Sequence, residues 1–491
     1  MTNKSFVLRI YSIALLLRLI PILLARGLGI GLDDMFQYDM LARSIASGNG
    51  FRWYAREDLN QLASFVNFDL SSVKEYDPLR GIPTSFRAPL YPTFLAIVYF
   101  FSGAGFSRFF AARLAQAIFL GAPLAPLTYL VSKKLFPPLR VGEEAGLRSE
   151  RAAQIAAWII AGYPMLLVYP LGLGTENPFF LLLLASFFFL LRLQEQPTII
   201  NSLLSGFFLG LTALTRSVIL PFVGLAILWA WFILRQRRGA MVIALAFTLT
   251  IAPWVIRNSL LHHKLTGIET SMGYNLYLGY HPQGNGSFVF GPSLDLLTIL
   301  DDAERDRIGT QKAIEFIKAQ PERFIPLAIN RLGFFFGLEK RVLMYFYGNN
   351  IIGYIPLPVL LTISAILLLP FVFISVSAAF GLAYLRWKPG HTLLCLLLIG
   401  YLLPHVLILS EDRFHLALVP YIAILAAQVW VNGFVPLRVR WYESWQGKLI
   451  VSLAIFAVFL LIINWNFELI RDADRIVQLL GPSGNQSYFP Y

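Results

Sequence analysis

Long apolar runs alternate with polar segments along this chain, and the pattern predicts a bundle of membrane-spanning helices. Several runs extend for about 18 to 25 residues with few or no charges, the length of helix that crosses a bilayer. The first span follows Lys4 and Arg9 and ends near Arg26. Because this run is long and no small-residue cleavage site follows it, we interpret it as a span and not as a signal peptide. Ten more spans are predicted near residues 109–134, 152–170, 178–191, 200–215, 217–234, 240–258, 353–385, 392–410, 414–434 and 449–467.

Two long polar segments separate groups of spans, and their charge balance predicts that both lie outside the cell. Residues 31–87 carry six Lys/Arg and eight Asp/Glu, and residues 259–350 carry nine of each kind. Cytoplasmic loops are enriched in Lys and Arg, so segments without a basic excess are typical of the exterior. Within the second segment, residues 301–331 are predicted to form one or two amphipathic helices, because isoleucines recur at helical spacing and Pro321 suits the first turn of a helix.

Short clusters of basic residues mark the cytoplasmic ends of the predicted spans. They are Lys133 and Lys134 with Arg140, Arg148 and Arg151; Arg192; Arg235, Arg237 and Arg238; Arg386 and Lys388; and Arg438, Arg440 and Lys448. The N-terminus is then cytoplasmic, and the tail after residue 468 lies outside. Residues 89–102 are apolar but fewer than the roughly 17 residues that a span requires, and a crossing there would invert every later basic cluster. We therefore expect this segment to be re-entrant or to lie along the outer face, which leaves about eleven spans.

Composition narrows the class of protein further. The 491 residues are 57% hydrophobic, 15% aromatic and only 14% charged, with a mean hydropathy of +0.64. These values exclude a soluble enzyme and a disordered chain. The net charge of +12 lies in short clusters between apolar runs, which is typical of membrane topology and not of nucleic-acid binding. The single cysteine, Cys395, excludes a disulfide framework and a cysteine metal cluster.

The spans and polar segments divide the chain into three predicted parts. Residues 1–258 form an N-terminal transmembrane catalytic module that includes the outer loop 31–87, residues 259–350 form an outer segment with amphipathic helices, and residues 351–491 form a C-terminal transmembrane module with a short tail. No low-complexity linker divides the chain. No internal repeat suggests the inverted halves of many transporters.

Two adjacent carboxyls, Asp33 and Asp34, stand at the outer end of the first span. Ionisable groups near membrane depth are costly and are therefore candidates for function. Like charges side by side raise one pKa, which helps a carboxylate to accept a proton as a general base. The pair is equally compatible with a bound cation or with an ordinary helix start capped by Asp. The residues alone leave these three alternatives open.

A basic residue, Arg87, stands at the far end of the same loop, before the proline-framed segment 89–92. Its planar guanidinium can bind a phosphate at headgroup depth through two hydrogen bonds, or it can anchor the chain at the interface. Further polar groups are predicted on the same outer side, at Glu176, Arg216, Arg257, Asn258, Glu411, Asp412 and Arg413. Arginines beside carboxylates at this depth suit an anionic headgroup together with an acid/base pair. They indicate a phosphate-linked lipid as the substrate class.

Motifs for soluble nucleotides and for metals are absent from the sequence. No phosphate-binding glycine loop and no dinucleotide fingerprint occur, so nothing indicates ATP or a soluble nucleotide-sugar. No His-x-x-x-His or similar metal motif occurs either. His262, His263 and His281 are loop histidines, which are usually not ligands.

Six short motifs, in order over about residues 10–430, resemble the GT-C superfamily of membrane glycosyltransferases. The resemblance is to the branch that contains protein O-mannosyltransferases and lipid A aminoarabinose transferases. The motifs are Asp34-x-x-x-Tyr38-x-x-x-Ala42 running to Gly48-Asn49-Gly50-Phe51; Arg87-Ala88-Pro89-Leu90-Tyr91-Pro92; Thr175-Glu176-Asn177-Pro178; Gly206 through Arg216; Pro253-Trp254-x-x-Arg257-Asn258, continuing through Gly273-Tyr274-Asn275 to Gly286; and Glu411-Asp412-Arg413-Phe414 ahead of Pro420. Each motif is short, and their order and spacing carry the resemblance.

The resemblance implies an all-α polytopic GT-C fold and an inverting glycosyltransferase. Such an enzyme moves a sugar from a polyprenyl-phosphate-linked donor to a hydroxyl acceptor (protein, lipid or cell-envelope glycan) on the extracytoplasmic face of the plasma (inner) membrane. The likeness implies that Asp34 is the catalytic base with Asp33 in support, and that the donor phosphate is bound by Arg87, Arg257 and Arg413. It implies a substrate lining formed by Tyr38, Tyr91, Glu176, Arg216, Asn258, Tyr274 and Asn275. No cofactor is implied, although a divalent metal at Asp33 and Asp34 is one alternative.

Two departures from the family pattern concern the donor sugar more than the reaction class. Asp33 and Asp34 form an Asp-Asp pair where many relatives have Asp-Glu, and Arg87 stands where the aminoarabinose branch has Lys. The sugar, hexosyl or pentosyl, stays undetermined, as do the acceptor and the oligomeric state. The alternative functions are a ligase or polymerase of polyprenyl-linked glycans and a lipid or solute transporter. A transporter would show charges near the middle of its spans, where Arg18 is the only strong candidate.

Overall fold

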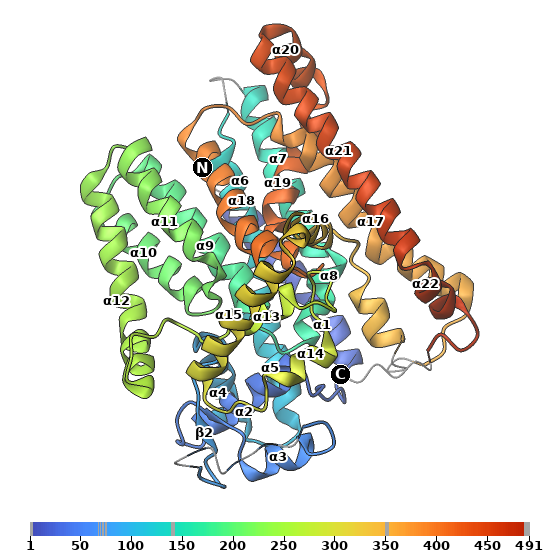
Figure 1. The fold of residues 1–491 in the computed structure, drawn as a ribbon. Helices are drawn as coiled ribbons and strands as arrows, with labels where there is room; N and C mark the ends of the chain where they lie inside the picture. The colour runs from blue at the N-terminus through green and yellow to red at the C-terminus, as the bar shows by residue number, and fades with distance from the viewer. Residues whose placement is uncertain are drawn as a thin grey trace.

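The protein is almost entirely helical (Figure 1). The computed structural model describes residues 3–66, 68, 70, 73, 76–138, 143–348 and 353–485. Across these residues the one sheet is a short antiparallel pair in the first outer loop, formed by β1 (Arg52–Trp53) and β2 (Ile82–Pro83). The all-α, multi-span fold class that the hydropathy pattern predicts is confirmed.

Among the described residues, eight helical runs are long and apolar enough to cross a bilayer. They are α1 (Lys4–Leu24), Ser107–Leu135, α9 (Glu176–Glu195), α12 (Arg237–His262), α17 (Leu357–Leu382), α18 (Pro389–Leu407), Phe414–Asn432 and α21 (Trp445–Arg471). The pair Glu144–Gly162 and Pro164–Leu171, bent by 50°, makes a ninth. Two shorter apolar helices, α10 (Ile199–Ala213) and the run Ser217–Ile233, coincide with the spans predicted at 200–215 and 217–234. These helices of the described chain account for all eleven predicted segments.

Several of these runs are built from shorter pieces. Ser107–Leu135 contains α5 (Ser107–Gln116), a π-helical turn (Ala117–Gly121) and α6 (Leu124–Leu135); the bent pair contains α7 (Glu143–Gly162), α8 (Pro164–Val168) and a 3₁₀ turn (Tyr169–Leu171). Ser217–Ile233 contains a 3₁₀ turn (Ser217–Ile219), α11 (Leu220–Leu228) and a π-helical turn (Trp229–Ile233); Phe414–Asn432 contains a 3₁₀ turn (Phe414–Leu418) and α19 (Val419–Asn432). Two of these interruptions coincide with prolines that remove a backbone donor, Pro123 and Pro164.

The bend between α7 and α8 is stabilised by a buried arginine. Pro164 has no N–H, so the carbonyl of Ile160 loses its usual intrahelical donor. Arg18, which is fully buried in α1, supplies donors instead. Its Nη2 lies 3.2 Å from the Ile160 oxygen and its Nη1 lies 3.3 Å from the Ala161 oxygen. The mid-span charge that a transporter would use is here a cap for a broken helix.

The apolar segment 89–102 forms α4 (Leu90–Ser102), a helix of 13 residues. At about 1.5 Å per residue it is roughly 20 Å long, which is less than the roughly 30 Å of a hydrocarbon core. It packs against α2 (Asp34–Ala46) and turns back into α5. Ile97, Phe100 and Phe101 on its outward side are each more than half exposed. Length alone does not decide whether this helix crosses the bilayer, since α10 (Ile199–Ala213) is also short, and the expectation that residues 89–102 do not cross stays a prediction.

The helices described between α12 and residue 348 form a group that lies at the front of Figure 1, between the α9–α12 group and the pair α17 and α21. It contains α13 (Met272–Tyr280), α14 (Phe290–Asp295), α15 (Asp302–Ala319), α16 (Phe324–Phe335), a 3₁₀ turn (Pro321–Arg323) and a π-helical turn (Leu343–Tyr347). α13 and α15 approach closely, since a Cβ on Gly273 would lie 1.9 Å from the carbonyl oxygen of Asp306. The one or two amphipathic helices predicted at 301–331 correspond to α15 and the first part of α16, with the break at Pro321.

The core of the bundle surrounds α19, whose residues are nearly all buried against α7 and α17. By contrast, α1, α12 and α21 are peripheral, with less than a quarter of their most apolar stretches buried inside the protein. Figure 1 shows α20 (Val435–Glu443) and α22 (Ala473–Leu480) at opposite ends of α21, and α3 (Arg56–Leu62) with β2 at the lower end of the molecule. Peripheral helices with apolar surfaces are expected where lipid, and not protein, covers them.

Candidate active site

A cavity of about 970 Å³ lies between α2, the start of α9, α13 and the turn before α19. Its centre is polar. The polar residues that line it include Asp33, Asp34, Gln37, Tyr38, Arg87, Glu176, Arg216, Glu269, Tyr274, Asn275, Arg341, Glu411 and Arg413. They come from segments spread from residue 33 to residue 413, so the site exists only in the folded bundle.

Asp33 and Asp34 stand at the beginning of α2, and their side chains have different partners. Asp33 is the N-cap, and its Oδ1 accepts a hydrogen bond from the backbone N–H of Met35 at 2.8 Å. This is the helix-cap alternative that the sequence left open. Asp34 is the first helical residue, and its carboxylate pairs with Arg87 on one side and Arg413 on the other, where Arg413 Nη2 lies 3.4 Å from Oδ2. Asp34 is therefore the carboxylate that faces the basic groups.

Arg87 is held in place from several sides. Its Nε donates to Gln37 Oε1 at 2.8 Å, and its guanidinium carbon lies 5.3 Å from the centroid of the Tyr38 ring. The backbone before it is fixed by α15, because Asp302 Oδ2 accepts a hydrogen bond from the N–H of Ser85 at 2.7 Å. The guanidinium is thus preorganised at the cavity wall, which lowers the cost of binding an anion.

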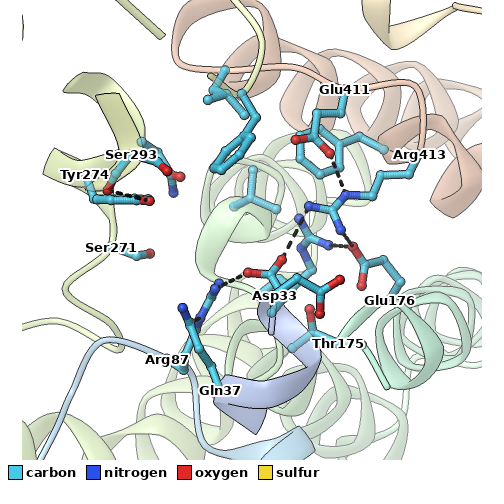
Figure 2. A pocket seen from close by; sticks show the side chains of 18 of the residues that line it. Asp33, Gln37, Arg87, Thr175, Glu176, Ser271, Tyr274, Ser293, Glu411 and Arg413 are labelled. Atoms are coloured by element: carbon cyan, nitrogen blue, oxygen red, sulfur yellow. Dashed lines mark hydrogen bonds and ion pairs between the residues drawn. The ribbon is translucent and has the colours of Figure 1, made fainter. Parts of the chain in front are cut away.

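Arg413 is the centre of a second network of charges. Its Nε lies 2.7 Å from Glu411 Oε2, and its Nη1 lies 3.6 Å from Glu176 Oε1. Arg216 also reaches Glu176 Oε1, at 2.8 Å, and Arg341 also reaches Glu411 Oε2, at 2.9 Å. Figure 2 shows Arg413 between these two glutamates. Asp34, which pairs with both Arg413 and Arg87, connects this network to Arg87.

The protonation of the two aspartates differs because their neighbours differ. Burial alone would raise the pKa of the Asp34 carboxyl, but nearby guanidiniums, first that of Arg87 and then that of Arg413, hold this pKa below its ordinary value. Burial and the adjacent Asp34 charge raise the pKa of the Asp33 carboxyl. At neutral pH the site therefore presents an ionised Asp34 among cationic groups.

The other side of the cavity is formed by α13 and the segments that follow it. Figure 2 shows Ser271, Tyr274 and Ser293 facing the charged centre across the open space. The hydroxyl of Tyr274 donates to the carbonyl oxygen of Ser293 at 3.3 Å, and burial raises the pKa of Tyr274 to about 12. Asn275 follows on the same helix and also lines the cavity. These neutral polar groups suit hydroxyl-rich ligands.

Arg257 and Asn258, predicted as phosphate- and substrate-binding residues, lie outside the described lining of this cavity. Arg257 donates to the carbonyl oxygens of Thr84 and Phe51, and its guanidinium lies 4.8 Å from the ring centroid of Trp254. It fastens the first outer loop to the end of α12 and does not reach the pairs formed by Asp34. In this structure Arg257 holds the loop and not the cavity lining, and its assignment to the donor phosphate stays a prediction.

The side-chain amide of Asn258, like the guanidinium of Arg257, hydrogen-bonds to backbone carbonyls. It donates to the carbonyl oxygens of Gly267 and Ile268 at 2.9 and 3.0 Å, which closes the turn after α12. Tyr91, also predicted to line the substrate, is fully buried outside the described lining, and its hydroxyl donates to Gln116 Oε1 at 2.6 Å. Five of the residues predicted to line the substrate do line this cavity: Tyr38, Glu176, Arg216, Tyr274 and Asn275.

Three charged or amide side chains of the site, those of Gln37, Glu269 and Arg341, were not predicted from the sequence. Gln37 and Glu269 line the cavity, and Glu269 accepts hydrogen bonds from the backbone N–H and hydroxyl of Ser217. Arg341 belongs to the charge-balanced segment before α17, where no motif singled it out. The periodicity of α2 carries a signal for Gln37, because it lies one helical turn after Asp34.

Apolar side chains flank the charged centre on several sides. The first outer loop contributes Leu62, Phe65, Val66 and Phe68; the bend after α7 contributes Met165 and Val168; and the second outer segment contributes Phe288, Phe290, Leu294, Leu297, Phe324 and Phe346. A polar centre with apolar flanks is what an amphipathic ligand requires, since its headgroup needs ionic partners and its chain needs apolar surface.

Metal binding at the aspartate pair finds little support in the donor set. Asp33 accepts a helix N–H, and both oxygens of Asp34 face guanidiniums. Within the described parts of the chain, no group of three or more His, Cys, Asp or Glu side chains is arranged to hold an ion. Independence from metal stays a prediction.

Comparison with known proteins finds similarity in solved structures alone. No family model and no curated protein matches the chain. The chain is similar to ArnT from Cupriavidus metallidurans bound to undecaprenyl phosphate, with 12% identity over 89% of this chain and 80% of that chain and a TM-score of 0.38. The apo state of ArnT from the same organism gives 14% identity over 90% of this chain and 80% of that chain, with a TM-score of 0.35. Superpositions this loose assign no function to this chain.

Proposed function

We propose that the chain is a GT-C-type inverting glycosyltransferase that uses a polyprenyl-phosphate-linked sugar as donor and a hydroxyl group as acceptor. The observation that carries the proposal is the ionised carboxylate of Asp34, paired with Arg87 and Arg413 in a cavity with apolar flanks. These three residues belong to three of the motifs that resemble the superfamily. The sugar is a hexose or a pentose, and the acceptor is a protein, a lipid or a cell-envelope glycan.

The donor phosphate has a suitable partner in Arg87. A guanidinium carries five N–H donors in a planar fork that matches phosphate oxygens. Among the described residues, Arg87 directs one nitrogen to Gln37 and another to Asp34, and its remaining donors are available to a ligand. The apolar flanks would receive the first units of the polyprenyl chain.

The reaction then needs one proton transfer and one displacement. Asp34 takes the proton of the acceptor hydroxyl while the acceptor oxygen forms a bond to the anomeric carbon. The bond from that carbon to the phosphate oxygen breaks, and its electron pair leaves with the phosphate. Because attack and departure occur on opposite faces of the sugar, the configuration inverts. The leaving group is already a stable anion, so guanidiniums that stabilise its charge serve it better than an acid.

Donor binding would also adjust the strength of the base. With Arg87 and Arg413 as its partners, Asp34 has a lowered pKa and is a weak base. When the donor phosphate draws Arg87 toward itself, the carboxylate loses one of the positive charges that lower its pKa. Its affinity for a proton rises at the moment when an acceptor hydroxyl needs one. The arrangement therefore couples occupancy of the donor site to activation of the base.

The site is proposed to face the extracytoplasmic side of the plasma (inner) membrane, with a cytoplasmic N-terminus. Two of the spans illustrate the argument. α9 begins at Glu176 in the cavity and carries Arg192 in its last turn, whereas α18 begins next to Lys388 and ends near the cavity. Basic residues thus occupy the opposite ends of the same helices, as expected if those ends are cytoplasmic.

The proposal is tested by incubating purified protein in detergent with a panel of polyprenyl-phosphate monosaccharides and candidate acceptors. Release of free polyprenyl phosphate that requires both an acceptor and Asp34 supports the proposal. Its matched comparison is Asp34→Asn, which keeps the shape of the side chain. Intact donors across the panel, from protein shown to be folded, would count against transfer and favour a ligase or a transporter.

A further inference from the structure

Three consecutive charged residues connect the active-site cavity to the helix bundle. Arg341 points to the cavity, where it reaches Glu411 Oε2 at 2.9 Å. Lys340 points the other way, and its Nζ lies 2.6 Å from Glu468 Oε1 near the end of α21. Glu339 points into the core and is 1% exposed. The contacts of Lys340 with Glu468 and of Glu339 in the core therefore fix the backbone that carries Arg341.

Glu339 belongs to a fully buried hydrogen-bonded cluster. Its Oε1 accepts the hydroxyl of Tyr163 at 2.6 Å and lies 3.0 Å from His415 Nε2. His415 Nδ1 lies 2.7 Å from the carbonyl oxygen of Phe335. Among the described residues, Glu339 Oε2 is buried without a hydrogen-bond partner. The cluster has no exposed atom through which water could replace a lost contact.

This geometry determines how many protons the pair holds. A carbonyl oxygen can only accept, so Nδ1 of His415 carries a proton. The contact between His415 Nε2 and Glu339 is attractive only if one further proton lies between them, on either atom. Without that proton, a nitrogen lone pair would face a carboxylate in a site that water does not reach, which costs free energy.

The groups around the pair help to retain this proton. Burial raises the pKa of the Glu339 carboxyl. Phe371 of α17 stacks on the His415 ring with centroids 4.1 Å apart, which keeps that side dry. The ionisable groups of the packed elements are Tyr163 between α7 and α8, Lys340 beside Glu339, Asp412 and Arg413 before α19, His405 of α18 and Glu468 of α21.

We propose that Glu339 and His415 are positioning residues that form a one-proton clamp and hold Arg341 and Arg413 at the spacing at which both contact Glu411. Glu339 precedes Arg341 by two residues, and His415 follows Arg413 by two. The clamp therefore joins the two backbone segments that carry these arginines. Both guanidiniums contact the same oxygen, Glu411 Oε2, at 2.9 and 2.7 Å. A shift of either segment would break that shared contact.

The clamp makes the site sensitive to alkaline pH. When the pair loses this proton, the nitrogen lone pair faces the carboxylate, so the clamp's contribution to stability is lost as the pH rises through the point at which the proton leaves. The inference rests on the proposed function, because Arg413, which the clamp holds beside Arg341, is taken to help bind the donor phosphate.

The test compares the wild type with Glu339→Gln. Glutamine keeps the size of the side chain, and its amide donates to the neutral His415, but it has no proton to lose in this range. Glu304→Gln is the matched control, because Glu304 forms an exposed pair with Arg307 on α15, at 2.6 Å. For each protein we would measure Tm, and the affinity for a polyprenyl phosphate in detergent, from about pH 6 to about pH 9.

For the wild type and Glu304→Gln, we expect Tm to fall at alkaline pH and the affinity to fall by about tenfold, while Glu339→Gln shows neither alkaline limb. Parallel Tm curves in all three proteins would overturn the clamp. If the Tm curves of the wild type and Glu339→Gln diverge but the affinity for polyprenyl phosphate does not change with pH, Glu339 and His415 do not position the arginines. The Glu339–His415 pair would then serve stability alone. Absence of binding to the wild type at every pH would instead count against the proposed function, and Tm alone would then decide the clamp.

A second variant keeps the inference testable if Glu339→Gln fails to fold. Tyr163→Phe removes one hydrogen bond that stabilises the ionised form of Glu339 and changes no charge. The pair should then hold its proton to higher pH, so the alkaline limb of Tm should move upward. A limb that stays in place, or that moves to lower pH, would contradict the clamp.

Discussion

Under the proposed mechanism, replacing Asp34 by Asn should separate donor binding from sugar transfer, because the carboxylate there competes with the phosphate for Arg87 and also serves as the base. The substitution keeps the shape of the side chain and removes the charge that Arg87 and Arg413 share. Transfer should fall by about 10²–10⁴-fold, the usual contribution of a general base. Binding of a polyprenyl phosphate should become tighter and not weaker.

The size of the binding effect follows from the exposure of the pairs. The side chain of Asp34 is 38% exposed to the cavity, and those of Arg87 and Arg413 are 19% and 18% exposed. Ion pairs with this much solvent contact contribute about 0.5–1 kcal/mol after screening. A phosphate that displaces the carboxylate from one guanidinium gives up that amount. Removing the competitor should therefore tighten binding by about two- to fivefold.

The assay measures both quantities on the same purified protein. Affinity for a polyprenyl phosphate is measured by calorimetry in detergent, and transfer is measured as release of polyprenyl phosphate from the donor. Asp33→Asn is the matched neighbour, since Asn caps a helix about as well as Asp. It should retain stability and lose far less transfer. Unchanged turnover in Asp34→Asn would remove Asp34 from the mechanism, and weakened phosphate binding would refute the competition with Arg87.

Other substitutions and a change of pH address the remaining parts of the structure. Arg87→Ala should weaken polyprenyl phosphate binding by about tenfold or more in titrations, whereas Arg257→Ala should lower Tm and leave the affinity of the folded protein near that of the wild type. Arg18→Met should lower Tm, because the carbonyl of Ile160 then lacks a donor; an unchanged Tm would contradict its capping role. The lowered pKa of Asp34 implies that its pairing stabilises the fold above the ordinary carboxyl range and is lost as the pH falls below it, so acid unfolding of Asp34→Asn should be less steep.

The spans could be predicted from the sequence because hydropathy is a local property. An apolar run such as α17 or α21 has to lie in lipid or in a core whatever it packs against. The bend at Pro164 was harder to predict. The sequence shows the proline, but Arg18, which donates to the carbonyl freed by that proline, lies far away in the chain. α10 is shorter than the length expected of a span, and it packs against α9 and α12, which the length of an apolar run does not predict.

The site was predictable to the extent that its residues lie in motifs. Asp34, Arg87 and Arg413 were found in this way, and the structure brings them together. Arg257 lies in a motif too, but the first outer loop takes its donors, and sequence cannot tell which neighbour a guanidinium will choose. Arg341 was missed for the same reason, because in the run from Glu339 to Arg341 only tertiary packing decides which charge faces the cavity.

The pairing of Arg413 with Asp34 also has a consequence for how the chain matures. The two residues are 379 positions apart, and Arg413 precedes the last two spans. During synthesis Asp34 and Glu176 reach the membrane long before the cation that they share. Carboxylates at this depth with an incomplete set of partners are costly. A chain truncated before residue 411 therefore lacks both the core helix α19 and the cation that Asp34 and Glu176 share, so these carboxylates stay incompletely paired until the last two spans are made.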